Sequence, residues 1–282
     1  MKLEMVTLAF NNPEQVRRTL ASVALQSVAP DRHIVVDGSS LEFTSEIQQW
    51  AEKAGAEYHW RNPRGVYPAM NDALSEISSE SRVWFLNSSD WLASPESIAT
   101  ARESLAIDSH WAVGGLHRYG DKNVPFHPSP REGKSFIGAL RSGRIGFPHP
   151  SAIMSKAGID RCGGFDESFQ IAGDYALAIR FAAVFGAPQL IPDVLSIHEP
   201  TGLTSRHKVL HVMEKVRARQ QSGATVGGEM AALFGLARTY TTPSMTRSRG
   251  RILDRVLPAF SRDNPELTWP EGCLSILDSW GG

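Results

Sequence analysis

The first hundred residues alternate between two hydrophobic periodicities, and this alternation restricts the chain to few folds. Short apolar runs typical of strands are separated by longer segments in which apolar residues recur at helical spacing. The predicted strands are residues 5–10, 33–36, 57–60 and 83–86, and the predicted helices are residues 13–27, 42–54 and 67–77. Successive strands joined by crossover helices lie parallel in one sheet. The sequence therefore predicts an α/β fold with a mostly parallel sheet flanked by helices.

The pattern is less regular in the second half of the chain. Residues 117–150 contain five prolines and five glycines, and long loops of this kind are usually functional lids or disordered. Helices are expected over residues 94–107 and 174–185, and strands over 111–116 and 151–155. From residue 205 onward we expect helices and loops without a further strand-rich domain.

Composition narrows the class of protein. The chain has 282 residues, of which 41% are hydrophobic and 21% are charged, as in ordinary globular enzymes. Cys162 and Cys273 are its only cysteines, too few for a disulfide framework or a four-cysteine zinc site. No signal-sequence pattern precedes the first strand, and no apolar run reaches the roughly 18 residues of a membrane span. We therefore expect a cytoplasmic enzyme.

Residues 206–262 form a basic segment. They contain eleven Lys and Arg against three acidic residues, an excess of eight positive charges, whereas the whole chain has a net charge of −1. Such a segment suits an anionic membrane surface, nucleic acid or a phosphate-bearing substrate. A solvated helical face explains it equally well.

Two aspartates follow predicted strands. Asp37 ends the second strand before a Gly-Ser-Ser turn, and Asp90 lies four residues beyond Leu86, after Asn-Ser-Ser. Each alone is also an ordinary turn residue, since Asn, Ser and Asp favour turns. In a parallel sheet, however, both carboxylates lie along the C-terminal edge, where ligands of open α/β sheets bind. Two carboxylates at this edge suit Mg²⁺ or Mn²⁺ together with the phosphates of a nucleotide.

Several segments resemble, in the correct order, the inverting nucleotide-sugar glycosyltransferases of family 2, which have the GT-A fold. They are Asp37–Thr44, Gly65–Asn71, Phe85–Asp90, His149–Ser151, and Gly163–Glu167 followed by Ala172–Tyr175. Each motif alone is weak, but their order makes the signal specific. The resemblance covers about residues 3–205 and is closest to bacterial enzymes that build exopolysaccharide, colanic-acid-like or O-antigen chains. It implies a Rossmann-like GT-A domain over 1–205 and a C-terminal helical extension over 206–282. Within the domain, residues 1–100 would bind the nucleotide sugar and residues 101–205 would bind the acceptor.

The resemblance also implies roles for single residues. Asp174 would be the general base that takes the proton of the acceptor hydroxyl as it attacks the anomeric carbon. Asp90 would bind Mn²⁺ or Mg²⁺, which stabilises charge on the leaving nucleoside diphosphate. The donor would be contacted by Phe10, Asn11, Asp37, Asn71, Ser89 and Asp90. The acceptor would be contacted by His149, Asp166 and Glu167.

Each of these residues has a structural alternative. Asp174 opens an apolar helix, where a carboxylate stabilises free backbone N–H groups. Asp166 and Glu167 suit a loop that leads into that helix, and His149 suits an ordinary loop. Asn71 suits the exposed surface of a helix. Arg180, six residues after Asp174, is expected off the face that carries the carboxylate.

The implied function is metal-dependent inverting transfer of a sugar from a nucleoside-diphosphate donor, expected to be a UDP-sugar. The acceptor would be a hydroxyl of a saccharide or lipid-linked saccharide in surface polysaccharide synthesis. Pro68 replaces an Asp of related enzymes, and Asp90 is a single carboxylate where many have two, so an inactive nucleotide-binding or scaffold protein is the alternative. A dinucleotide-binding oxidoreductase is disfavoured, because Asn11-Asn12-Pro13 replaces the glycine-rich turn after the first strand.

The basic segment raises a hypothesis about location. Lipid-linked acceptors would sit at the inner face of the membrane, and an anionic surface there attracts Lys and Arg. The residues expected to contact it are Arg217, Arg219, Arg247, Arg249, Arg251 and Arg255. No nucleic-acid partner is expected.

Overall fold

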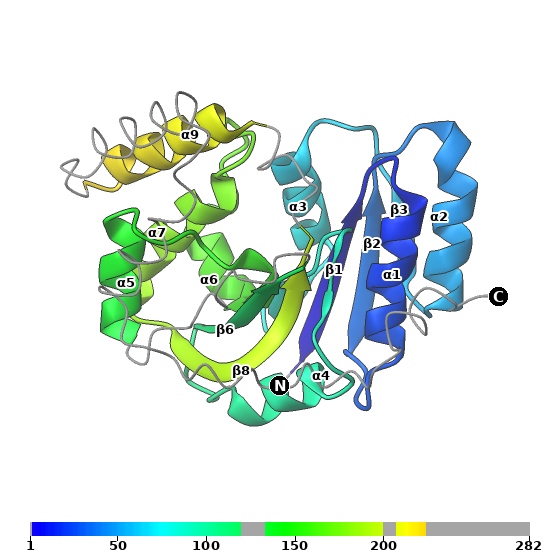
Figure 1. The fold of residues 1–282 in the computed structure, drawn as a ribbon, viewed down its shortest axis with the longest axis horizontal. Helices are drawn as coiled ribbons and strands as arrows, with labels where there is room; N and C mark the ends of the chain where they lie inside the picture. Colours follow the sequence, from blue (N-terminus) through cyan, green and yellow to red (C-terminus); the bar gives the residue numbers. More distant parts are fainter. Residues whose placement is uncertain (1, 120–132, 200–206, 224–282) are drawn as a thin grey trace, which may run out of the picture.

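An eight-stranded sheet forms the centre of the computed structural model, which describes residues 2–119, 133–199 and 207–223 (Figure 1). Its first half contains four parallel strands, with β1 paired to both β2 and β4, and β2 paired to β3. These strands are β1 (Leu3–Ala9), β2 (Arg32–Asp37), β3 (Glu57–Trp60) and β4 (Arg82–Phe85). All four lie within two residues of the predicted strands, and their parallel arrangement is confirmed.

The second half extends the sheet in mixed orientation. It consists of β5 (Asp90–Leu92), β6 (Trp111–Arg118), β7 (Ala152–Ser155) and β8 (Gln189–His198). Strand β7 runs antiparallel to both β4 and β6, β8 runs parallel to β6, and β5 runs antiparallel to β8. The resulting order is β3-β2-β1-β4-β7-β6-β8-β5. The pairing of β6 with β8 shifts register near Gly115, and β8 curves strongly across the sheet (Figure 1).

Helices cover both faces of the sheet. Helix α1 begins with Pro13, whose fixed φ angle suits a first helical position. On one face, Ala9 and Val35 pack with Val16 and Ile47 of α1 and α2, and on the other face α3 and α7 cover the strands. The helices that frame the first half are α1 (Pro13–Ala24), α2 (Leu41–Lys53), α3 (Val66–Ser75) and α4 (Ser97–Ser104). The second half contributes α5 (Gly133–Arg141), α6 (Lys156–Arg161), α7 (Gly173–Phe185) and α9 (Lys208–Gln221), together with the short 3₁₀ helix His149–Ser151.

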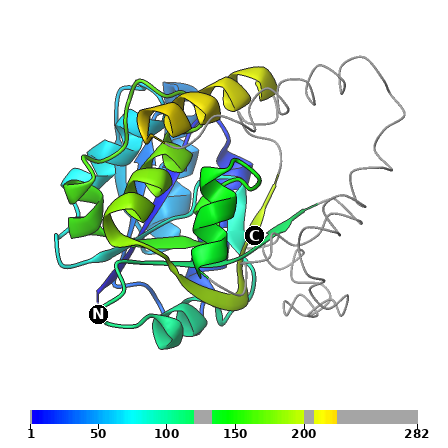
Figure 2. The ribbon, with the colours of Figure 1, turned by 90° about the vertical axis from the view of Figure 1, so that its left-hand side faces the viewer.

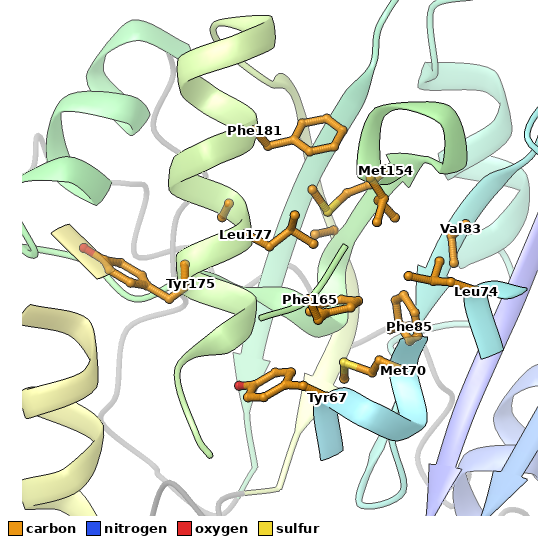
Figure 3. Close-up of a cluster of buried hydrophobic side chains, with 14 of the residues drawn as sticks. Tyr67, Met70, Leu74, Val83, Phe85, Met154, Phe165, Tyr175, Leu177 and Phe181 are labelled. Atoms are coloured by element: carbon orange, nitrogen blue, oxygen red, sulfur yellow. The ribbon is translucent and has the colours of Figure 1, made fainter. Parts of the chain in front are cut away.

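The largest hydrophobic cluster joins the two halves. Tyr67 and Met70 of α3 meet Phe85 of β4 and Phe165 of the loop before α7, and Leu177 of α7 completes the contact (Figure 3). Residues about a hundred positions apart therefore share one core. No helix of the described residues is long and apolar enough to cross a membrane.

Several elements differ from the sequence-based expectation, among them the short helix α6, which was not predicted. The prediction of a loop over 117–150 is wrong for residues 133–141, which form helix α5. This helix buries Phe136, Ala139 and Leu140 at helical spacing, but Gly133 and Gly138 weaken the helical pattern in the sequence. Strand β8 was not expected because it contains Pro192, whose side chain is exposed and which is disfavoured within a sheet. Strand β5 has only three residues and follows a polar turn, so it has no periodicity of its own.

Candidate active site

The ends of β1 and β2 form a tightly hydrogen-bonded polar edge. The backbone N–H of Asn11 donates to Ser39 Oγ at 2.7 Å, and Asn11 Oδ1 accepts the N–H of Ser40 at 2.9 Å. Asn11 has a φ of 53°, in the left-handed region that Asn tolerates better than most residues. The loops after the two strands are thus fixed to each other, as a binding edge requires.

Asp37 lies inside this edge rather than on its surface. Its side chain is fully buried, Oδ1 accepts the N–H of Ser39 at 2.8 Å, and Oδ2 accepts the hydroxyl of Tyr58 at 2.8 Å. Burial and the Asp37 carboxylate raise the pKa of Tyr58 well above its ordinary value, so this hydroxyl stays protonated. Asp37 therefore holds this polar edge together, and its contact with a donor stays a prediction.

Exposed aromatic rings border the same edge. Phe10 is 60% exposed and Trp60, at the end of β3, is 44% exposed. Trp60 Nε1 donates to the Ser39 carbonyl at 2.9 Å, which orients the indole. Gly38 lies close to Phe10 and Pro63, because a β-carbon at this position would lie 3.6 Å from Phe10 Cδ2 and 3.4 Å from Pro63 Cβ. Exposed, oriented rings suit the stacking of a planar base. Trp60 was not predicted, although its place at a strand end next to this edge was visible in the sequence.

Asp90 is paired with a histidine that the sequence did not indicate. It is 5% exposed, opens β5, and its Oδ1 lies 2.6 Å from Nδ1 of His198 at the end of β8. Burial raises the pKa of Asp90, and the hydrogen bond from His198 opposes that rise. Ser89 immediately before it has a φ of 85°, a strained value for a residue with a side chain, which costs about 1–3 kcal/mol. Such strain is concentrated at functional sites.

The group around Asp90 fits a divalent cation. The Asp90 carboxylate and the His198 imidazole lie side by side, joined by one hydrogen bond, and Asn87 Oδ1, three residues before Asp90, is buried without a hydrogen-bond partner among the described residues. No cluster of three or more His, Cys, Asp or Glu that would hold a metal alone occurs in residues 2–119, 133–199 and 207–223. Mg²⁺ and Mn²⁺ need no such cluster, because they retain water and take phosphate oxygens as further ligands.

Asp174 lies in the first turn of α7, as predicted. Its Oδ1 accepts the N–H of Tyr175 at 2.8 Å and lies 3.3 Å from the hydroxyl of Tyr67, which reaches across from α3. Burial raises the pKa of Asp174, and the N–H of Tyr175 and the charge of His211 act in the opposite direction. Residue 173 must be glycine for this contact, because a β-carbon there would lie 2.7 Å from the Tyr67 ring. The carboxylate is thus held in one orientation by the Tyr67 hydroxyl and the Tyr175 N–H.

One aromatic cluster lies between Asp174 and Asp90, and Figure 3 shows its rings of Tyr67, Phe165 and Phe85. The ring of Tyr67, which contacts Asp174, lies 5.8 Å from the ring of Phe165, measured between centroids. The Phe165 ring lies 5.4 Å from that of Phe85, and the Phe85 ring lies 5.5 Å from that of His149. His149 is buried, burial lowers its pKa to about 4, and the Asp90 carboxylate opposes this shift. Tyr67 at one end of this aromatic layer contacts Asp174, and His149 at the other end lies close enough to Asp90 for their charges to interact.

The remaining predicted residues shape the loop before α7. Asn71 Nδ2 donates to the Phe165 carbonyl and to Glu167 Oε1, each at 2.9 Å, and Asn71 Oδ1 accepts the N–H of Phe165 at 3.0 Å. Asp166 Oδ1 accepts the N–H of Ser168 at 2.9 Å. The contact of Asp166 matches its structural alternative, whereas Asn71 binds the loop rather than lying on an exposed helix surface, and donor and acceptor contacts of both remain predictions.

Arg180 also has a structural position. Its guanidinium donates to the carbonyls of Cys162 and Gly164, each at 2.7 Å. Gly163 and Gly164 both have positive φ angles, 79° and 68°, and arginine fixes the turn that they form. The arginine therefore supports the loop that carries Phe165.

Two of the arginines predicted to contact a membrane, Arg217 and Arg219, form contacts within the protein. Arg219 is buried on α9 against Gly143, and Arg217 donates to Ser168 and lies 4.3 Å from the centroid of the Phe169 ring. The prediction that Arg219 faces a membrane is therefore wrong, because its side chain is buried, whereas membrane contact of the partly exposed Arg217 stays a prediction. The other four lie outside the described residues.

Comparison with known proteins identifies the family. The family model described as glycosyl transferase family 2 matches residues 5–164, which is more than half of the chain. The chain belongs to this family. This family 2 glycosyltransferase is 28% identical over 220 residues to the uncharacterized glycosyltransferase Rv1514c of Mycobacterium tuberculosis, an alignment that covers 76% of this chain and 81% of the relative.

Solved structures share the fold of this glycosyltransferase. The TarS enzyme of S. aureus (residues 1–349) in complex with UDP-GlcNAc superimposes with a TM-score of 0.61 at 17% identity, covering 79% of this chain and 66% of TarS. The mannosyltransferase PcManGT from Pyrobaculum calidifontis in complex with GDP-Man and Mn²⁺ gives a TM-score of 0.56 at 18% identity, covering 99% and 84%. At these identities the similarity establishes the GT-A fold, and family membership establishes a glycosyltransferase enzyme rather than the scaffold alternative.

Proposed function

We propose that this glycosyltransferase moves a sugar from a nucleoside diphosphate to an acceptor hydroxyl with inversion, using Asp174 as the base and Asp90 as the metal ligand. The observation that carries the proposal is the aromatic layer that joins these two carboxylates. Their environments differ, because Asp90 is paired with a histidine whereas Asp174 is held by a helix start and a tyrosine hydroxyl. Two acids in unlike environments suit two different tasks.

The donor nucleoside is proposed to bind at the edge formed by the ends of β1, β2 and β3. The exposed rings of Phe10 and Trp60 would stack on the base, and the polar groups of Asn11 and Ser89 would contact ribose and phosphate. We favour a UDP-sugar, in line with the UDP-GlcNAc complex of TarS, while the GDP-Man complex of PcManGT makes GDP the competing nucleotide.

A divalent cation, Mn²⁺ or Mg²⁺, is proposed to be held by Asp90 and His198. When bound, it would neutralise charge that develops on the leaving diphosphate. His198 Nδ1 lies 2.6 Å from Asp90 Oδ1, so a cation bound by both side chains would replace the hydrogen bond between them. The buried Asn87 Oδ1 faces the same turn without a partner among the described residues and would accept a bond from bound water.

Asp174 is proposed to take the proton of the acceptor hydroxyl. The hydroxyl oxygen forms the new bond to the anomeric carbon while the bond to the diphosphate breaks, so attack from the opposite face inverts the configuration. The hydroxyl of Tyr67 and the N–H of Tyr175 fix the orientation of the carboxylate, which supports this role. Burial, which raises the pKa of Asp174, strengthens it as a base.

The acceptor is proposed to be a saccharide or lipid-linked saccharide of surface polysaccharide synthesis, bound on the side of His149, Asp166 and Glu167. This part of the proposal, together with a closest relationship to colanic-acid-type enzymes, rests on motif resemblance. The division into a nucleotide-sugar half over 1–100, an acceptor half over 101–205 and an extension over 206–282 belongs to the same proposal.

Thermal denaturation with nucleoside diphosphates, with and without Mn²⁺, tests the donor site. The correct nucleotide at a hundredfold excess over its Kd should stabilise the protein by about 2.7 kcal/mol. Asp90→Ala should lose the Mn²⁺-dependent part, whereas Asp193→Ala, which removes an exposed carboxylate of β8, should respond like the wild type. If no nucleotide raises the melting temperature with Mn²⁺ present, the donor site is wrong.

The role of the base is tested separately. Asp174→Asn keeps the size of the side chain but cannot accept the proton, so transfer should fall by roughly 10²–10⁴ while nucleotide binding stays intact. A variant that still transfers sugar at the wild-type rate would remove Asp174 from the mechanism.

A further inference from the structure

Helix α9 contributes a buried carboxylate to the segment that precedes Asp174. Glu214 is 5% exposed, and its Oε1 accepts the backbone N–H of Gln170 at 2.8 Å. Its Oε2 accepts the N–H of Ile171 at 2.8 Å and that of Ala172 at 2.9 Å. One carboxylate thus binds three successive N–H groups immediately before α7 begins at Gly173.

These N–H groups need a partner from elsewhere in the chain. The first backbone N–H groups of a helix and the turn leading into it have no intrahelical acceptor. Ala172, the N-cap residue of α7, has no side-chain oxygen to supply one. Glu214 supplies it from a helix more than forty residues further along, and a charged acceptor makes these hydrogen bonds stronger than neutral ones.

Other contacts fix α9 in the register that Glu214 requires. Arg217, one turn further along, donates to the carbonyl of Ser168 at 3.3 Å. Lys215 donates to the Ile145 carbonyl at 3.3 Å, and its ammonium lies 4.8 Å from the centroid of the Tyr175 ring. Helix α9 therefore contacts α7 and two segments that precede α7 in the chain, and it lies beside α7 in both views (Figures 1 and 2).

The family model ends at residue 164, well before this helix. Glu214 therefore lies outside the matched residues, and it binds the backbone immediately before Asp174, the proposed base. Without Glu214 the turn over Gln170–Ala172 would have to find water or new partners, and the start of α7 would move with it.

We propose that Glu214 is a positioning residue for sugar transfer, which fixes the backbone over 170–172 so that the Asp174 carboxylate faces the acceptor hydroxyl. This inference rests on the proposed role of Asp174 as the general base. Glu214 touches neither substrate, and it acts only through the backbone that it binds. A displacement of a catalytic group by about 1 Å costs up to roughly a hundredfold in rate.

Glu214→Gln tests the role with little change in shape, because the amide replaces one acceptor oxygen with an N–H₂ group that faces N–H donors. We expect kcat to fall by about 10- to 100-fold while the donor KM is nearly unchanged. Amide hydrogen exchange should become faster at residues 170–172. Glu214→Asp keeps both acceptor oxygens on a shorter arm and should recover part of kcat. Gln220→Ala changes an exposed side chain of the same helix and should leave both readouts at wild-type values.

The result separates the positioning role from a purely structural one. A Glu214→Gln protein with faster exchange at 170–172 and wild-type kcat would overturn the proposal, as would unchanged exchange at these residues. If Glu214→Gln does not fold, the same comparison with Glu214→Asp decides. Full transfer by Asp174→Asn would refute the base and the positioning role together. Lost transfer by Asp174→Asn with full transfer by Glu214→Gln would refute the positioning role alone.

Discussion

A buried histidine makes the stability of this protein sensitive to acid. His33 in β2 is 6% exposed, and its Nε2 lies 2.9 Å from Thr7 Oγ1. The Thr7 hydroxyl donates its own proton to the Leu86 carbonyl at 2.8 Å, so Nε2 must carry the proton of the neutral imidazole. Nδ1 is then an unprotonated nitrogen, and it is buried without a hydrogen-bond partner among the described residues. Protonation would place an N–H there with no acceptor.

The size of the effect follows from the pKa. Burial lowers the pKa of His33 to about 4, whereas an unfolded chain has a histidine pKa of about 6.5. Between these values the unfolded state binds the proton and the folded state does not, so stability falls as the pH falls. At pH 5 the loss amounts to about 2 kcal/mol, and it approaches roughly 3 kcal/mol at pH 4.

Chemical denaturation at pH 7 and pH 5 measures this loss. His33→Gln keeps an amide N–H that can donate to Thr7 but cannot be protonated, so it should lose about 2 kcal/mol less than the wild type between the two pH values. His207→Gln removes an exposed histidine and should behave like the wild type. His149, whose pKa burial also lowers to about 4, contributes equally to all three proteins and cancels in the difference. An identical pH dependence of stability in His33→Gln and the wild type would show that protonation of His33 does not cause the loss.

Three further predictions concern the site. Gly173→Ala places a β-carbon 2.7 Å from the Tyr67 ring and should lower the free energy of unfolding by about 1–3 kcal/mol, whereas Gly138→Ala in α5, with open space around it, should not destabilise. Tyr67→Phe removes a hydroxyl that lowers the pKa of Asp174, so the acidic limb of the kcat/KM pH profile should move to higher pH. Arg180→Met leaves two carbonyls without their charged donor and should lower the melting temperature, with an expected loss of about 2–3 kcal/mol.

The site shows where sequence reasoning succeeds. Asp174 could be placed at a helix start because the apolar spacing of α7 and the preceding Gly-Gly-Phe segment are local features. Asp37 was correctly placed at the end of β2, yet both its oxygens bind Ser39 and Tyr58, a pairing that needs β2 and β3 to be neighbours. Local patterns locate a residue on an element, but they do not reveal which groups its side chain meets.

His198 and Glu214 mark the limit of this reasoning. His198 ends a strand that contains Pro192, and it reaches Asp90 only because β8 pairs antiparallel with β5. Glu214 lies in a basic helix that looked like a solvated or membrane-facing surface, although its carboxylate is buried. Neither position has a sequence signal, since burial and pairing at this distance arise from packing of the whole domain.

The class of fold follows from hydrophobic periodicity, because this pattern specifies strands, helices and their alternation without reference to the rest of the chain. The family follows from several motifs that are weak singly but occur in the correct order. The neighbours of Asp90 and Asp174 follow from packing alone. His198 lies 108 residues from Asp90, Tyr67 lies 107 residues from Asp174, and Glu214 lies 43 residues from Ile171, whose N–H it binds. Contacts of that range form when the sheet closes and the helices pack, so their physical cause lies in the fold as a whole.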